Sequence, residues 1–176
     1  WQRAPILYLA LRETEHDGQN HRYFEAWSEY GPWYDRFTEG VFAVTDGVRK
    51  AAASALEPRP DRPREIARRL FKHVQSTVRY VAIQLGMGGW RPTAADEVAD
   101  TQSGDCKDMS SYLKALLATE DIKSDIVELG TRGEHLTTTP ESNLRHFNHA
   151  ILRVALGPEE GGPLLLDPTC DTCAFG

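Results

Sequence analysis

The sequence predicts an α+β protein in which helices come first and an antiparallel sheet follows a central helix. Three observations favour this fold class. The N-terminal half carries helix-forming runs, residues 101–122 predict one further helix, and the segments after them alternate apolar runs with turn residues. Because consecutive strands joined by short turns pair antiparallel, we expect N-terminal helices packed against an antiparallel sheet.

Size and charge bound the possible functions. The chain has 176 residues, enough for one domain with a real hydrophobic core. The formal net charge of −6 argues against a nucleic-acid partner. Residues 59–69 carry five arginines, which we interpret as a solvated helix face rather than an anion site. No apolar run reaches the length of a membrane span.

The first half of the chain reads as a series of helices. Residues 20–30 predict a helix that ends at Gly31 and Pro32, and residues 45–57 predict a second, capped by Thr45 or Asp46. Pro63 begins a stronger helix, because its missing N–H costs nothing in the first helical position. Apolar residues at helical spacing then form a stripe that reaches about Tyr80: Ile66, Leu70, Phe71, Val74 and Val78.

Short strands dominate the second half. Around the central helix, which starts near Cys106, we expect a strand at 79–85, a loop at 86–89, a short helix at 93–100 and strands at 124–130, 146–156 and 164–169. The polar residues 131–145 predict a mobile loop, and 157–163 a turn. Pro168 ends the last strand, since proline cannot continue a sheet ladder.

Cys106 stands at the predicted start of the central helix, among charged residues. Unpaired N–H groups and the positive end of the helix dipole would lower the pKa of a thiol there, and Lys107 would add to this effect. Asp105 and Asp108 would oppose it, and Asp105 is a candidate helix cap. Gly104 permits a close approach of the chain. The alternative is that Cys106 is simply a small buried apolar residue.

A cysteine nucleophile needs a base, and His149 is the best placed of six histidines. His16, His21 and His73 lie in polar surroundings where we expect exposure, and His135 and His146 lie in or beside the polar loop. His149 instead lies within a predicted strand, where a base can be held rigidly. A satisfied, half-buried core histidine is the competing interpretation.

Asp167 follows an apolar run at the end of the last predicted strand. If residues 146–156 and 164–169 pair as neighbours, Asp167 can face His149 and orient its ring. A turn-initiating aspartate before proline is the alternative for this residue alone. Cys106, His149 and Asp167 together make the pattern of a Cys-His-Asp triad.

Three ordered segments resemble the transglutaminase-like superfamily, a papain-like fold, and its bacterial branch in particular. These segments are "GDCKDMSSYLKALL", "FNHAILRV" and "LLLDPT", preceded by "VRYVAIQLGMGGWRPTAADEV". The resemblance covers roughly residues 60–170. It implies that Cys106 is the nucleophile, His149 the general base and acid, and Asp167 the orienting carboxylate.

The same resemblance implies the organisation and setting of the chain. Residues 1–60 would be a helical N-terminal segment that links to an upstream domain, and 61–176 the transglutaminase-like catalytic core. A periplasmic or envelope location and a peptide or protein substrate also follow from the resemblance alone. We expect no cofactor and no metal ion at this site.

Two features leave alternatives open. Gln84 and Trp90 are candidate oxyanion or substrate-binding residues, although each also fits an ordinary surface position, and Trp90 an apolar wall. Cys170 and Cys173 form a CxxC pattern that is compatible with a disulfide, two free thiols or half of a metal site.

The sequence therefore predicts thiol-dependent acyl transfer on amide bonds, either peptide hydrolysis or transfer to an amine. The triad does not distinguish these outcomes, because access of water decides between them. A catalytically silent binding or scaffold module on the same fold is the alternative function. A zinc or redox function for Cys170 and Cys173 lacks the second ligand pair or the βαβ context that it would need.

Overall fold

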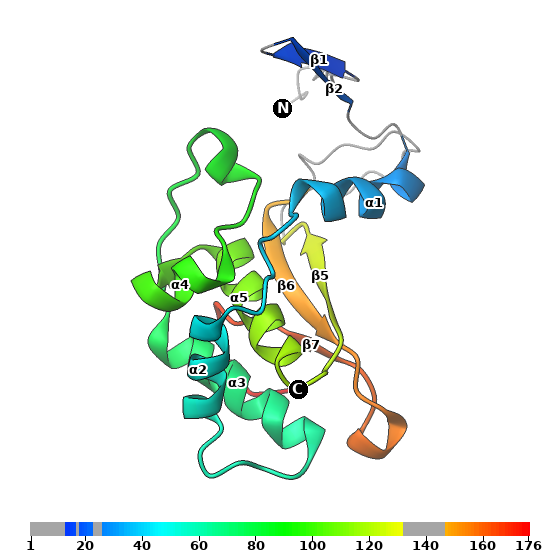
Figure 1. Ribbon diagram of the computed structural model, residues 1–176. Helices are drawn as coiled ribbons and strands as arrows, with labels where there is room; N and C mark the ends of the chain where they lie inside the picture. Colours follow the sequence, from blue (N-terminus) through cyan, green and yellow to red (C-terminus); the bar gives the residue numbers. More distant parts are fainter. Residues whose placement is uncertain (1–12, 17, 23–25, 132–146) are drawn as a thin grey trace, which may run out of the picture.

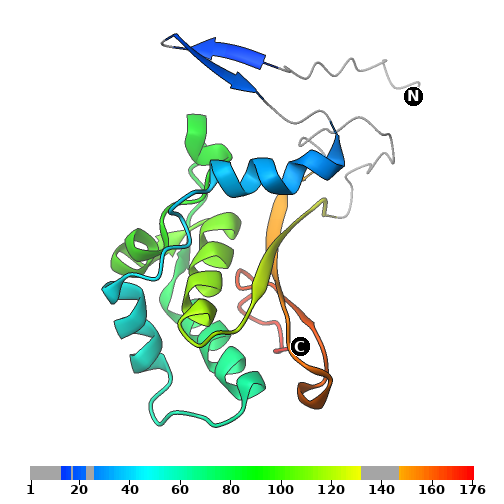
Figure 2. The same ribbon diagram turned by 45° about the vertical axis from the view of Figure 1, so that its right-hand side comes forward.

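Helix α5 (Cys106–Ala118) lies between a group of helices and a three-stranded sheet, as the ribbon of the computed structural model shows (Figure 1). The structure describes residues 13–16, 18–22, 26–131 and 147–176. Helices α2, α3 and α4 lie on one side of α5, and the sheet lies on the other (Figure 2). The predicted α+β class with an antiparallel sheet is confirmed.

The other α-helices of the described residues precede α5 in the chain. They are α1 (Trp27–Phe37), α2 (Asp46–Ala55), α3 (Pro63–Thr77) and α4 (Ala95–Thr101), with short 3-10 turns at Gly86–Gly89 and Pro158–Glu160. Pro63 opens α3 as predicted. The Thr45 side chain caps α2 by accepting a hydrogen bond from the backbone N–H of Val48.

The strands of the described residues form three small sheets. Strands β1 (Glu13–His16) and β2 (Gln19–Arg22) make an antiparallel hairpin, and β3 (Arg79–Tyr80) pairs in parallel with β4 (Ser103–Gly104). The main sheet has the order β5 (Ser124–Leu129), β6 (His149–Val154), β7 (Leu164–Leu166), antiparallel throughout. Strands β6 and β7 are neighbours in this sheet, as the predicted contact between His149 and Asp167 requires.

The hydrophobic core lies around α5. Alternate residues of β6 turn toward this helix, and Leu152 and Val154 are fully buried. The predicted stripe on α3 is buried over its whole length, from Ile66 to Val78. Helix α2 adds Val48 and Ala52, so this packing includes residues from the predicted N-terminal segment. The predicted domain division stays a prediction.

The expected helix at 20–30 is wrong in both position and end. Residues 19–22 form β2, and α1 begins at Trp27 and continues through Gly31 and Pro32 to Phe37. Proline inside a helix removes one backbone hydrogen bond and usually interrupts it. Here aromatic side chains spaced at three and four residues stack along α1, and this packing outweighs the local propensity.

Three smaller expectations also need correction. The strand at 79–85 is only two residues long, and residues 86–89 form a 3-10 turn instead of an open loop. His73 is half-buried rather than exposed, with Nε2 3.3 Å from the hydroxyl of Tyr112. Burial lowers the pKa of His73, because it disfavours the charged ring.

The arginines of residues 59–69 are engaged within the chain. Arg59 pairs with Glu120, Arg62 lies 3.4 Å from Glu160, and Arg68 and Arg69 pair with Glu65. Arg64 donates to the backbone carbonyl of Glu160 at 2.9 Å. These contacts agree with a helix face rather than an anion site.

Most of the loop predicted at 131–145 lies outside the described residues, as do His135 and His146. None of the helices in the described ranges combines the length and the hydropathy that crossing a bilayer requires.

Candidate active site

A capping box stabilises the N-terminus of α5. The Asp105 carboxylate accepts hydrogen bonds from the N–H groups of Lys107 at 3.1 Å and Asp108 at 3.2 Å. In return, the Asp108 carboxylate accepts from the N–H of Asp105 at 3.0 Å. These bonds satisfy backbone donors that a helix N-terminus otherwise leaves unpaired. The Lys107 ammonium pairs with Asp105 and lies 3.7 Å from Asp108, so it neutralises part of their charge.

Gly104 and Asp108 fix the chain around Cys106. A Cβ atom on residue 104 would lie 2.6 Å from the Cβ of Asp108, so only glycine fits there without displacement. The other oxygen of Asp108 accepts from the N–H of Thr93 at 2.8 Å. Most of the "GDCKD" pattern therefore has a structural role in positioning Cys106 at the first turn of α5.

Cys106 is buried, with only 6% of its surface exposed, and it lines a cavity. Burial raises the pKa of its thiol, and the Asp105 carboxylate acts in the same direction. Backbone hydrogen bonds from Ala150 and Lys107, and the Lys107 charge, oppose this rise without reversing it. The expectation of a lowered thiol pKa is thus wrong, because desolvation outweighs the helix terminus.

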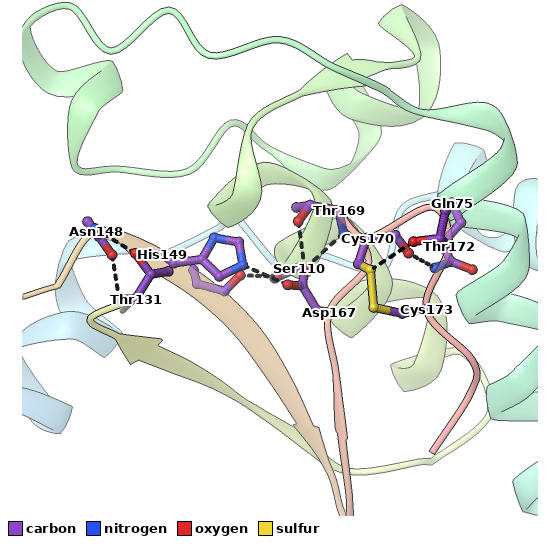
Figure 3. A network of polar contacts seen from close by, with 11 residues as sticks. Gln75, Ser110, Thr131, Asn148, His149, Asp167, Thr169, Cys170, Thr172 and Cys173 are labelled. Atoms are coloured by element: carbon purple, nitrogen blue, oxygen red, sulfur yellow. Dashed lines mark hydrogen bonds and ion pairs between the residues drawn. A yellow bond between two sulfur atoms is a disulfide. The ribbon is translucent and has the colours of Figure 1, made fainter. Parts of the chain in front are cut away.

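His149 and Asp167 form a hydrogen-bonded pair across β6 and the end of β7 (Figure 3). The distance from His149 Nε2 to Asp167 Oδ2 is 2.8 Å. Since a carboxylate only accepts, this bond places the proton of a neutral ring on Nε2 and leaves a lone pair on Nδ1.

Thr169 holds the same carboxylate from its other side. The hydroxyl and the N–H of Thr169 donate to Asp167 Oδ1 at 2.7 and 3.0 Å (Figure 3). Burial would raise the pKa of Asp167, but the bonds from His149 and Thr169 together lower it below its ordinary value. Asp167 therefore stays ionised and keeps the ring of His149 in one orientation.

A side-chain bond joins the helix to the strand at this point. The Ser110 hydroxyl, one turn after Cys106, donates to the backbone carbonyl of Ala150 at 3.1 Å (Figure 3). Ala150 directly follows His149 in β6. The Ser110 bond thus connects α5 to the start of β6, one turn after Cys106.

A cavity of about 460 Å³ lies at this junction. Its lining includes Cys106 and His149, and Asp167 touches His149 from behind. Gln84 and Trp90 also line it, so the structure brings the predicted site residues to one place. Trp90 is 50% exposed, and Gln84 lies in an irregular segment before the 3-10 turn. The size is that of an ordinary ligand pocket.

Sequence reasoning missed one wall of this cavity. Four aromatic residues of α1 and one carboxylate of β5 line it: Tyr30, Trp33, Tyr34, Phe37 and Glu128. The aromatic spacing along residues 27–37 was the available signal, but Gly31 and Pro32 were interpreted as a helix end. No pattern in the sequence distinguishes Glu128 from other polar strand residues.

Cys170 and Cys173 form a disulfide, which decides between the three possibilities left open. The bridge follows Thr169 directly, and the Gln75 side chain of α3 bonds the carbonyl of Cys170 (Figure 3). Within the described ranges, no three side chains of His, Cys, Asp or Glu are arranged to hold a metal ion.

Comparisons with known proteins identify the fold but no family. No family model matches the sequence, and no curated protein matches it. The structure is similar to a solved protein from Parabacteroides distasonis ATCC 8503 described as a "putative protease", with a TM-score of 0.61 and 14% sequence identity. The match covers 93% of this chain and 31% of that one, so this chain spans about a third of its length.

Proposed function

We propose that this protein is a thiol-dependent enzyme that cleaves amide bonds, with a peptide or protein as substrate. The observation that carries the proposal is the shared cavity of Cys106 and His149, with Asp167 bonded to the far nitrogen of the ring. The solved neighbour described as a "putative protease" supports hydrolysis, and the sequence pattern supports the transglutaminase-like superfamily.

The first half of the proposed reaction forms an acyl-enzyme. His149 Nδ1 takes the proton of the Cys106 thiol as the sulfur attacks the amide carbonyl, so a C–S bond forms. The C–N bond then breaks, and the ring returns the proton to the leaving amine. Asp167 stabilises the imidazolium without taking its proton.

The second half releases the acyl group. His149 accepts a proton from water, or from an amine, which attacks the thioester, and the C–S bond breaks as the thiol is restored. As the first residue of α5, Cys106 has a backbone N–H without an intrahelical acceptor, and this group would serve as one oxyanion donor. Gln84 or Trp90 would supply a second donor or an apolar wall.

We also propose a location in the periplasm or cell envelope. The Cys170–Cys173 disulfide supports an oxidising compartment, because such bonds rarely persist where thiols are kept reduced.

The test is amide hydrolysis of a fluorogenic peptide mixture by the wild type and two variants. We expect Cys106→Ala to abolish cleavage and His149→Ala to lower kcat at least about a hundredfold. Thermal unfolding of each variant controls for folding. Full activity of Cys106→Ala would refute the proposal. If the wild type itself cleaves no peptide, the silent scaffold is the better interpretation.

A further inference from the structure

Stacked aromatic rings form one wall of the cavity. On α1, the ring centroids of Tyr30 and Trp33 lie 5.8 Å apart, and those of Trp33 and Phe37 lie 4.9 Å apart with nearly parallel planes. Arg91 fixes the end of this helix by donating to the carbonyls of Phe37 at 2.9 Å and Glu39 at 2.8 Å. The wall is therefore an ordered set of π-faces that line the same space as the Cys106 sulfur.

Glu128 places one carboxylate among these rings. It lies on β5, lines the cavity and accepts a hydrogen bond from the Tyr30 hydroxyl. In the described part of the chain no lysine, arginine or histidine pairs with it. Lys107, the other charged side chain of this lining apart from the His149 pair, is held by Asp105.

The local charge around the wall is negative. Burial raises the pKa of Tyr34, and the nearby Glu128 carboxylate raises it further. Burial also raises the pKa of Glu128, and the hydrogen bond from Tyr30 offsets only part of that rise. A bound cation would stabilise the ionised form of this carboxyl, as neighbouring charges do in general.

We propose that the cavity recognises a protonated amine of the substrate, held against the α1 rings and the Glu128 carboxylate. Aromatic faces attract cations through their quadrupoles, and a carboxylate within the same wall adds a charged acceptor. The inference rests on the proposed function, because the α1 rings and Glu128 would bind the part of the substrate that lies next to the amide cleaved by Cys106. The substrate class is then a peptide with an ammonium group close to the reacting amide.

This ammonium group is distinct from an attacking amine. An amine held as an ammonium ion has no lone pair, so it cannot take the acyl group from Cys106 while it is bound in this way. An anionic substrate group fits poorly, because the Glu128 carboxylate in the wall would repel it. A purely apolar group would leave the Glu128 carboxylate desolvated without a new partner.

The test measures binding without catalysis, in the Cys106→Ala variant of the whole chain. Benzylamine, protonated at neutral pH, is compared with benzyl alcohol, which has nearly the same shape and no charge, by ligand-observed NMR titration. We expect benzylamine to bind at least about tenfold more tightly. Adding Glu128→Gln should reduce that preference to about twofold or less, whereas the control Glu97→Gln, an exposed carboxylate on α4, should preserve it.

Equal affinity for the two probes would overturn the inference, and so would a preference that survives Glu128→Gln. If Glu128→Gln does not fold, Trp33→Leu replaces it and should weaken benzylamine binding at least about threefold. A negative result in this binding test is distinguishable from a negative result in the test of peptide cleavage. Loss of the cation preference leaves peptide cleavage by Cys106 intact, and absence of peptide cleavage leaves the binding result unaffected.

Discussion

Cys106 combines a helix terminus with deep burial, and the two features have opposite effects on its thiol. The backbone N–H groups favour the thiolate, but removal from water favours the neutral thiol more strongly. In the proposed reaction the sulfur would therefore need His149 to take its proton, because the resting thiol is neutral.

Alkylation of Cys106 tests this balance. The only free cysteine of the chain should react with iodoacetamide along a pH curve whose midpoint lies above that of glutathione measured alongside. The reason is that a raised pKa shifts formation of the thiolate to higher pH. Rates are followed by mass spectrometry of the labelled chain. A midpoint below that of glutathione would indicate a resident thiolate and contradict the assignment.

At the scale of elements, the contact between α5 and β6 sets the geometry of the site. Two adjacent serines on α5 offer a matched comparison. Ser110 bonds the carbonyl of Ala150, while Ser111 is equally buried and its hydroxyl has no hydrogen-bond partner in the described part of the chain. The same substitution at the two positions removes the same atom with different consequences.

We expect Ser110→Ala to lower the free energy of unfolding by about 1–3 kcal/mol, since it leaves a buried carbonyl unpaired. It should also reduce kcat for peptide cleavage, because the start of β6 loses one of its ties to the first turn after Cys106. Ser111→Ala should be neutral or stabilising, since no bond is lost. Urea denaturation of both variants gives the comparison. Equal losses would show that the Ser110 bond contributes nothing specific.

Elements defined by periodicity were predictable from the sequence, and elements defined by packing were not. The α3 stripe and the cap at Thr45 follow local rules, so they agree with the structure closely. Helix α1 does not, because its aromatic stacking overrides the proline that marks a helix end by local rules.

The candidate site likewise contains residues that the sequence predicts and residues that it does not. Cys106, His149 and Asp167 carry a spacing pattern. The β6–β7 pairing brings His149 and Asp167 together, and Cys106 lines the same cavity as His149. Glu128 and the α1 rings line the cavity only because of tertiary contacts, so no pattern in the sequence predicts their place in the site. The direction of the Cys106 pKa shift could not be predicted from the sequence either, because it depends on how deeply the thiol is buried.

For the whole molecule, the Asp167 network links the site to stability in acid. The pKa of Asp167 in the folded protein lies below its ordinary value of 3.8. The stability gained from this shift is therefore fully present above that value and is lost as pH falls through the lower, folded pKa. Glu128 acts oppositely, because its raised pKa gives a cost that is relieved on acidification.

Removing the Asp167 charge should make the stability of the protein less sensitive to acid. We expect the free energy of unfolding of Asp167→Asn to fall less steeply than that of the wild type from about pH 5 to about pH 2. Guanidinium denaturation at a series of pH values measures both slopes. The control Asp125→Asn breaks only an exposed pair with Arg153 and should alter the curve little. Parallel curves for wild type and Asp167→Asn would contradict the prediction.

Helix α1 contributes no buried residue, and the hydrophobic core that surrounds α5 contains none of its side chains. Yet this helix supplies four rings that line the same cavity as Cys106. The residues of the hydrophobic core and the aromatic wall of the cavity thus occupy separate stretches of the chain. Substitutions at the lining positions of residues 27–37 leave the buried core unchanged, so the shape of the cavity wall can vary while Cys106 and His149 keep their places.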